Sequence, residues 1–208
     1  MVPPAALKGV VEKWVGCGLP LFSEKPPGRT HAEAVGLAEL VTQPNLIALN
    51  RRFNPLNNRF KDIVAAMDSP YFVEAHFLRH NRRDEPFAIE TGIHIVNLLE
   101  YICGPIQTVR TEIFANPLNP THFRLSRLGF SSGMEGLLKV FPCSGANFER
   151  LEVHSNELSA FLHGPFGEDS GRILLHRQGQ HGLNAEEILP QADSPLVVEQ
   201  GFVGEYCE

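Results

Sequence analysis

The sequence has no long hydrophobic run and no excess of positive charge, and each absence excludes a class of protein. No apolar stretch approaches the roughly 18 residues that a membrane-spanning helix needs, and the amino terminus has no basic segment followed by an apolar one. The formal net charge of −6 argues against nucleic acid as a partner, because phosphate binding needs a basic surface. With 43% hydrophobic and 20% charged residues among 208, the composition instead predicts a soluble globular protein with a buried core.

Paired cysteines are also missing. The sequence has four widely spaced cysteines and no C-x-x-C pair: Cys17, Cys103, Cys143 and Cys207. A disulfide framework or a structural zinc site would need closer or paired spacing, so we expect reduced thiols in a cytoplasmic protein. His76 and His80 are four residues apart, but their segment is typical of a β-strand, where they would not form a ligand pair. The sequence therefore predicts no metal site.

The first fifty residues alternate between helical and strand patterns. "LPLF" (19–22) and "NLIALN" (45–50) are typical of short buried strands, and Thr30 and Glu33 have the spacing of a capping box for the helix between them. This alternation predicts parallel strands joined by crossover helices. An earlier helix is predicted from apolar residues at helical spacing, which are Leu7, Val10, Val11 and Trp14.

From residue 51 the pattern changes. One amphipathic helix is predicted around residues 56–67, and a long second helix from about Phe87 to Cys103, ended by Gly104. We expect an α/β unit over residues 1–50, followed over residues 51–208 by an α+β domain with a large, mainly antiparallel sheet. The strands are expected at 71–78, 108–115, 122–130, 135–142, 148–155, 158–164 and 172–177.

A lysine stands at the carboxyl end of the predicted strand "LPLF", in the loop "EKPPGR" (24–29). An isolated loop lysine is most often a solvated surface residue. Open α/β sheets, however, bind their ligands at the carboxyl ends of parallel strands. Pro26 and Pro27 stiffen the backbone beside Lys25, and the Lys25–Pro26 bond is a candidate for the cis form. Both interpretations stay open on this evidence.

Two further segments combine charged and polar residues. In "AIETGIHIVNLLEYICG" (88–104), Glu90, His94, Asn97 and Tyr101 share one helix face, at spacings of four, three and four. Glu90 would then orient His94 and raise its basicity, which suits an imidazole that exchanges protons. The alternative is a polar helix edge that faces water.

The segment "NRRFNP" (50–55) follows the second strand and marks the change of pattern. Arg51 or Arg52 could reach a phosphate or a carboxylate with its forked guanidinium group. The alternative is a pair of ordinary arginines at the start of a helix.

Taken in order, these segments resemble the Gfo/Idh/MocA family of NAD(P)-dependent oxidoreductases. The resemblance rests on Glu24-Lys25-Pro26 after a strand, on "RRFNP", and on an acidic residue four before a histidine in "ETGIHIVNLLEYICG". The resemblance is specific over residues 1–110 and much less specific over the rest of the chain. It implies that residues 1–50 are the C-terminal part of a Rossmann domain, and that residues 51–208 form a substrate and oligomerisation domain.

The resemblance also implies an activity, which is hydride transfer between NAD or NADP and a hydroxyl carbon of a sugar, cyclitol or similar polyol. Lys25 would lie beside the nicotinamide and the substrate hydroxyl, His94 would be the acid/base, and Glu90 would assist it. Asn97 would join Lys25 and His94 in binding the substrate, and the protein would form a homo-oligomer through its sheet. The implied cofactor-binding residues are Val2, Pro3, Pro4, Glu24, Lys25, Pro26 and Arg52.

The sequence departs from the family pattern in three ways. Glu90 replaces an Asp found in many members, Asn97 replaces a second frequent Asp, and the G-x-G-x-x-G phosphate turn is absent. "MVPPAAL" is typical of a strand end turning into a helix, and "GFVGEYCE" of an unfinished helix. We therefore expect a chain that begins near the fourth Rossmann strand, stops before the final helices and binds NAD(P) weakly. The alternative function is a non-catalytic relative that binds a metabolite or a protein.

Overall fold

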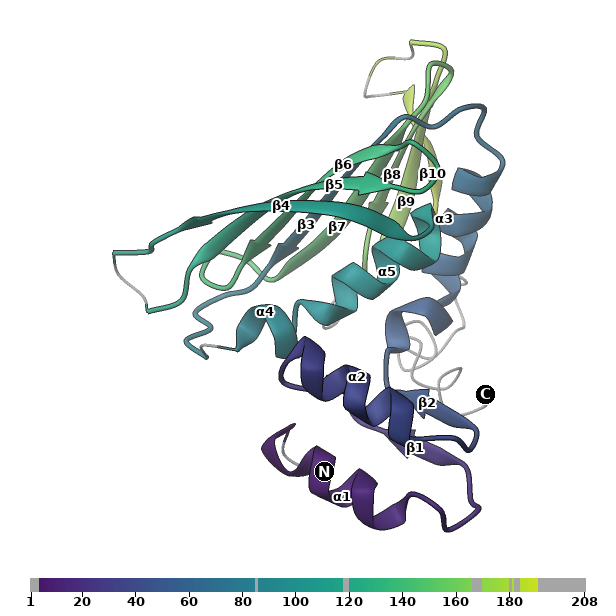
Figure 1. The fold of residues 1–208 in the computed structure, drawn as a ribbon. Coiled ribbons are helices and arrows are strands. Elements are labelled where there is room, and N and C mark those ends of the chain that lie inside the picture. Colours follow the sequence, from purple (N-terminus) through teal and green to yellow (C-terminus); the bar gives the residue numbers. More distant parts are fainter. Residues whose placement is uncertain are drawn as a thin grey trace.

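The computed structural model describes residues 4–84, 86–117, 120–165, 170–179, 181 and 184–190. Figure 1 shows a large twisted sheet with helices against one face, and a smaller group of helices and strands beneath it. Val2, Pro3, Cys207 and the expected helix at "GFVGEYCE" lie outside the described residues.

The smaller group holds the predicted α/β alternation. It consists of α1 (Pro4–Trp14), β1 (Leu21–Ser23), α2 (His31–Leu40) and β2 (Asn45–Ile47). β1 and β2 pair in parallel, as predicted. Leu7 and Val11 of α1 pack on Leu37 of α2 to form a small core. Thr30 caps α2 as predicted, since its hydroxyl accepts a hydrogen bond from the Glu33 backbone N–H at 3.2 Å. The Glu33 carboxylate accepts from the Arg29 backbone N–H at 2.7 Å, one residue before the position that a capping box requires.

The second group begins with η1 (Asn50–Phe53) and α3 (Pro55–Ala65), followed by β3 (Phe72–Leu78). Pro55 occupies the first turn of α3, and the Asn54 side chain caps that helix by accepting from the Asn57 N–H. The division of the chain at residue 50 stays a prediction.

The predicted helix from Phe87 to Cys103 is wrong in one respect, because it is broken into α4 (Phe87–Glu90) and α5 (Ile93–Cys103). The break falls at Thr91 and Gly92, both weak helix formers. A Cβ atom at Gly92 would lie 2.5 Å from the Ala88 carbonyl oxygen, so the close turn there requires glycine.

The sheet has eight strands in the order β10-β9-β8-β7-β3-β6-β5-β4. All neighbours pair antiparallel except β3 and β6, which run parallel, so the prediction of a mainly antiparallel sheet is confirmed. β10 was not predicted, because three residues of sequence EEI carry no alternating pattern. The remaining strands are β4 (Ile106–Phe114), β5 (Phe123–Phe130), β6 (Glu135–Phe141), β7 (Phe148–His154), β8 (Leu158–His163), β9 (Arg172–Arg177) and β10 (Glu186–Ile188).

Alternation along the central strands gives the sheet two different faces. On β3, Val73, Ala75 and Phe77 are buried, whereas Glu74 and His76 on the opposite face are half-buried. α3 and α5 cover the apolar face (Figure 1). We call the other face, which carries Glu74 and His76, the open face.

Two further predictions concern the cysteines and membrane-spanning helices. Cys17, Cys103 and Cys143 are free thiols, as expected for unpaired cysteines. The helices of the described residues are all too short or too polar to cross a membrane.

The core under α3 provides a stability test. Phe60 lies on α3 with 0% of its surface exposed, so Phe60→Ala should leave a cavity and cost about 3–5 kcal/mol of unfolding free energy in a urea titration. Arg59→Ala is the control, because this neighbouring side chain is exposed and its loss should change stability by at most about 0.5 kcal/mol. Equal effects of the two substitutions would contradict this account of the core.

Candidate active site

Lys25 reaches from the small α/β group to the large one. It follows β1 in a loop with a cis Lys25–Pro26 bond, as considered from the sequence, and Pro26 is buried. The half-buried Lys25 ammonium donates a hydrogen bond of 2.5 Å to the backbone carbonyl of Glu90 at the end of α4. Burial lowers the pKa of Lys25, Arg51 adds to this effect, and Glu24 and Glu90 oppose it. Lys25 is therefore in contact with another element, unlike a fully solvated loop lysine.

The break between α4 and α5 makes this contact possible. In an unbroken helix the Glu90 carbonyl would accept from the His94 backbone N–H, four residues on. Here that N–H turns to the carbonyl of Thr91 at 3.3 Å. The Glu90 carbonyl is thereby released from the helix and accepts from Lys25.

His94 lies in the first turn of α5, and its imidazole is half-buried. Its Nδ1 atom has no hydrogen-bond partner among the described residues. Burial lowers the pKa of His94 from 6.5 to about 3, with further contributions from Arg51 and Lys25. The ring is therefore neutral near pH 7 and carries an unprotonated nitrogen.

The expectation that Glu90 raises the basicity of His94 is wrong. The pKa of His94 is lowered, and the nearby carboxylate that opposes this shift is Glu149. The helix break explains the difference, because Glu90 and His94 now belong to separate helices. Glu90 instead contacts Lys25 through its backbone carbonyl.

A buried carboxylate holds two arginines near this histidine. Glu149, at the start of β7, is 5% exposed and accepts from Arg51 Nη2 at 2.7 Å and from Arg51 Nε at 3.3 Å. Arg79, at the end of β3, donates to the same carboxylate. Burial would raise the pKa of Glu149, but the two arginines outweigh it and hold that pKa below its usual range. Arg51, Arg79 and Glu149 also act on the charge state of His94.

The sequence analysis named Arg51 as a candidate but did not identify Glu149 or Arg79. The signal for Glu149 was a carboxylate in phase with Leu151 and Val153, on the apolar face of its strand. Its partner Arg79 is 70 positions away in the sequence, and no spacing rule connects the two.

Arg52 and Asn97 form a second polar group. Arg52 Nε donates to Asn97 Oδ1 at 3.2 Å, and the guanidinium lies 5.6 Å from the centre of the Tyr101 ring. Tyr101 donates to Asn58 on α3 at 2.8 Å. Arg52 and Asn97, predicted to bind the cofactor and the substrate, thus contact each other and join η1 to α5. The bond between Tyr101 and Asn58 joins α5 to α3.

A cleft lies beside Glu90. Its volume is about 510 Å³, and it opens between the start of α2 and α4, lined by Arg29, Thr30, Glu33, Pro86, Ile89 and Glu90. Of the other residues predicted to bind the cofactor, Glu24 is half-buried in the Lys25 loop and Pro4 is the first residue of α1.

The residues present fit one end of a nicotinamide cofactor. A neutral imidazole nitrogen and a lysine ammonium suit the reacting end, where a substrate hydroxyl loses its proton. The sequence contains no G-x-G-x-x-G turn that would cradle the pyrophosphate. The fit therefore concerns Lys25 and His94 and does not extend to the phosphates.

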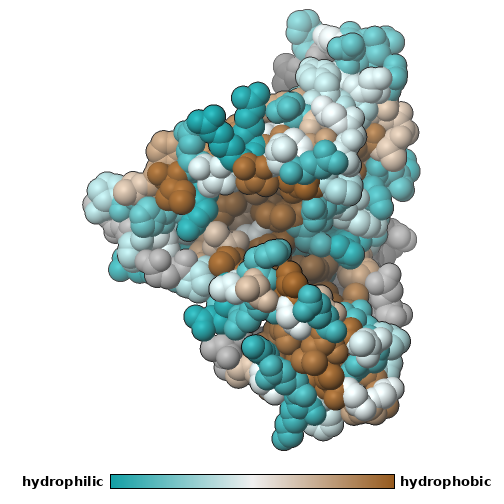
Figure 2. Space-filling view, in the orientation of Figure 1, coloured by the Kyte–Doolittle hydropathy of each residue, from teal (hydrophilic) through white to brown (hydrophobic). Residues whose placement is uncertain are grey.

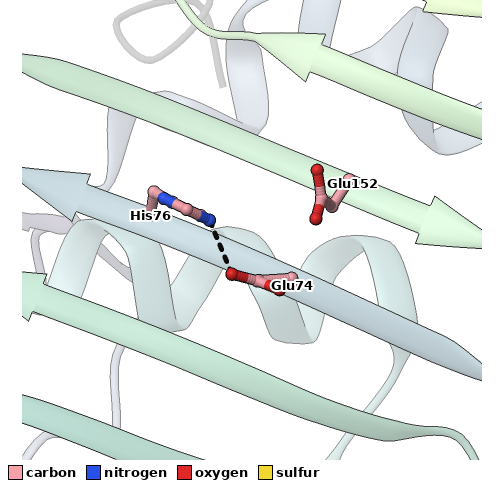
Figure 3. A group of neighbouring side chains, drawn as sticks. All are labelled: Glu74, His76 and Glu152. Carbon is pink, nitrogen blue, oxygen red and sulfur yellow. Dashed lines mark hydrogen bonds and ion pairs between the residues drawn. The ribbon is translucent and has the colours of Figure 1, made fainter.

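A separate group of possible metal ligands lies on the open face (Figure 3). Glu74 of β3 and Glu152 of β7 stand directly opposite each other, and with His76 they place three ligand atoms within 4.8 Å of one another. Glu74 accepts from His76 at 2.8 Å and from Lys139, and Glu152 pairs with Arg150. Lys139 and Arg150 thus already place positive charge beside the two carboxylates. The absence of a metal site stays a prediction.

Comparison with known proteins shows the fold. The chain aligns over 99% of its length with a dehydrogenase from Chromobacterium violaceum (TM-score 0.83, 16% identity) and with a Gfo/Idh/MocA family oxidoreductase from Vibrio cholerae (TM-score 0.80, 14% identity). It aligns over 98% with an oxidoreductase from Agrobacterium radiobacter in complex with NAD⁺, L-tartaric acid and magnesium (TM-score 0.74, 14% identity). The chain spans 65% of the length of each of these three structures.

No protein-family model matches the sequence, and no curated protein matches it. At these low identities the likeness concerns the fold. The chain therefore has the fold of Gfo/Idh/MocA oxidoreductases, a small Rossmann part followed by the large sheet domain, as the sequence resemblance predicted.

The low pKa of His94 makes stability depend on pH. The unfolded chain binds the His94 proton below pH 6.5, whereas the folded chain binds it only near pH 3, so falling pH favours unfolding across that window. At pH 5 the low pKa of His94 should reduce the free energy of unfolding by about 2 kcal/mol, and His94→Gln should remove that reduction. Urea titrations of both proteins at pH 7.5 and pH 5 measure the difference. His31→Gln, at an exposed position on α2, is the control; an unchanged pH dependence in His94→Gln would refute the assignment.

Proposed function

We propose that this chain carries the proton-transfer residues of an oxidoreductase that moves a hydride between NAD or NADP and a hydroxyl carbon of a sugar, cyclitol or similar polyol. The observation that carries the proposal is a half-buried, neutral imidazole whose buried Nδ1 has no hydrogen-bond partner among the described residues, and whose pKa is lowered in part by a lysine ammonium. The fold of the chain, shared with dehydrogenases, supports it. So does the NAD⁺ complex of the Agrobacterium radiobacter oxidoreductase.

The proposed roles follow from the charge states. His94 accepts the proton of the substrate hydroxyl, and the Lys25 ammonium stabilises the negative charge that develops on the oxygen. The carbon-bound hydrogen leaves with both bonding electrons, so the alcohol becomes a carbonyl. The nicotinamide, when bound, supplies the hydride acceptor. Glu90 positions Lys25 through its carbonyl, and its carboxylate favours the charged lysine.

Other parts of the proposal rest on the resemblance. Pro4, Glu24, Pro26 and Arg52 are proposed to contact the cofactor, and Asn97 to contact the substrate. Weak NAD(P) binding by these 208 residues is also expected, because the sequence lacks the glycine-rich turn.

Replacement of Lys25 tests the function. Lys25→Ala should lower kcat/KM about 100-fold or more, because removing one donor from a developing oxyanion costs on this order. Turnover is followed by nicotinamide absorbance with a panel of sugars and cyclitols, and circular dichroism checks the fold. Lys13→Ala, at an exposed position in the last turn of α1, is the control. An unchanged rate would remove Lys25 from the mechanism, and no turnover with any substrate would favour the non-catalytic alternative.

We also propose that the protein forms a homodimer through the open face. This face presents aromatic and histidine rings in mutual contact, including Phe148 against His163 and Phe161 against His176. Its charges have both signs, as in the Lys139–Glu74 and Arg150–Glu152 pairs. A surface with both signs of charge can complement itself across a two-fold axis, so the proposed partner is a second copy of the chain.

The dimer can be tested by placing a charge on this face. Phe161→Glu should convert the dimer to monomers in size-exclusion chromatography with light scattering, because burying an unpaired carboxylate at an interface is unfavourable. Thr42→Glu is the control, since it adds the same group at an exposed position in the small α/β group. A wild-type monomer, or a dimer that survives Phe161→Glu, would rule out this interface.

A further inference from the structure

One edge of the large sheet is long and exposed. β4 is the last strand on its side of the sheet and pairs with β5 alone among the described strands (Figure 1). Residues 107–114 of this strand are all exposed. The outer side of an edge strand presents backbone N–H and C=O groups that can pair with another chain, unless the sequence protects them.

The edge at the other end of the described strands has the protection that β4 lacks. β10 is only three residues long, and its Glu186 and Glu187 form ion pairs with Arg177 and Arg172 of β9. Short length, charge, proline and irregular register are the usual means of blocking an edge. Residues 107–114 contain no lysine and no proline, and the irregular register of β4 is confined to its first residues.

The exposed side chains of β4 are apolar on one face and charged on the other. Val109 and Ile113 are 62% and 60% exposed on the face that the helices cover elsewhere, because α3 packs chiefly on β8 and β9 and α5 on β3. Arg110 and Glu112 lie on the open face, and neither has an ion-pair partner among the described residues. Figure 2 shows apolar surface beside hydrophilic surface where this edge lies.

We propose that β4 pairs antiparallel with β4 of a second copy of the chain, so that the two sheets become continuous across a two-fold axis at Thr111. In this register Arg110 of each copy faces Glu112 of the other, and Val109 faces Ile113. Cross-strand pairs of opposite charge and of apolar side chains both stabilise a sheet. The surface is thus complementary to itself, as a two-fold interface requires.

The positions of the charges select this register. Residues that face each other in an antiparallel ladder are both hydrogen-bonded or both not, so the axis must pass through a residue. An axis at Arg110 or Glu112 would set that charge against its own copy, which is unfavourable. An axis at Val109 or Ile113 would leave both charges opposite uncharged residues. Among these five positions, Thr111 alone pairs opposite charges.

The edge contact is separate from the dimer proposed for the open face and does not depend on it. Pairing along one strand buries little surface, so we expect a weak dimer with a Kd on the order of 100 μM. It therefore forms at protein concentrations far above those of a size-exclusion column. Where both contacts form, they join more than two chains.

Charge reversal along β4 tests the register. Sedimentation equilibrium of the Phe161→Glu protein up to about 1 mM isolates the edge contact and should show monomers in equilibrium with dimers. In that background, Arg110→Glu and Glu112→Arg each put like charges opposite each other twice per dimer. Each should weaken association about tenfold or more.

An equimolar mixture of these two variants gives the sharpest result. In a mixed dimer the two acidic side chains of one copy face the two basic side chains of the other, so the mixture should associate about as tightly as the Phe161→Glu parent. Damage to either chain alone would not be repaired in this way. Glu39→Arg, exposed on α2, is the control, since it makes the same charge change as Glu112→Arg and should leave association unchanged.

Three results would overturn the proposal. They are a protein that stays monomeric at about 1 mM, association that neither reversal weakens, and a mixture that does not regain affinity. Circular dichroism checks the fold of each variant. If Phe161→Glu disturbs the fold, the same reversals and the same mixture in the wild-type background provide the comparison.

Discussion

The buried pairing of Glu149 with Arg51 and Arg79 is the interaction on which the site depends. Glu149 lies in β7, Arg79 directly follows the neighbouring strand β3, and Arg51 lies in η1, directly after the small α/β group. A buried ion pair adds little net stability because of desolvation, yet removing one partner leaves an uncompensated charge in the interior. Because moving η1 away from the sheet would leave such a charge behind, the pairing holds η1 in place even if it adds little to the free energy of unfolding.

A second constraint is the broken helix between Glu90 and His94. Gly92 permits a turn too tight for any side chain, and the break frees one backbone carbonyl from the helix. That carbonyl accepts the lysine from the loop after β1. The low helix propensity at Thr91 and Gly92 thus allows a contact that holds Lys25 at the end of α4, the helix before the one that carries His94.

The helices and strands that could be predicted from the sequence are those that a local pattern of residues specifies. Strand-like segments between turn residues revealed β3 to β9, helical spacing revealed α3, and the Thr30–Glu33 spacing revealed the start of α2. It could not reveal β10, whose three residues show no period, or the parallel pairing of β3 with β6, which depends on how the strands are arranged in space. The uninterrupted helix from Phe87 to Cys103 was predicted because apolar periodicity continues across Gly92, while the close approach to Ala88 is visible only in three dimensions.

The candidate site likewise has features that the sequence reveals and features that only the structure reveals. The residue types of Lys25 and His94 and their order in the chain pointed to proton transfer, but the charge on His94 depends on groups that the sequence leaves far away. Burial lowers the pKa of His94 most, and Arg51 and Lys25 add to this effect while Glu149 opposes it. Arg51 and Glu149 are 98 residues apart in the sequence, so no local spacing could reveal this influence.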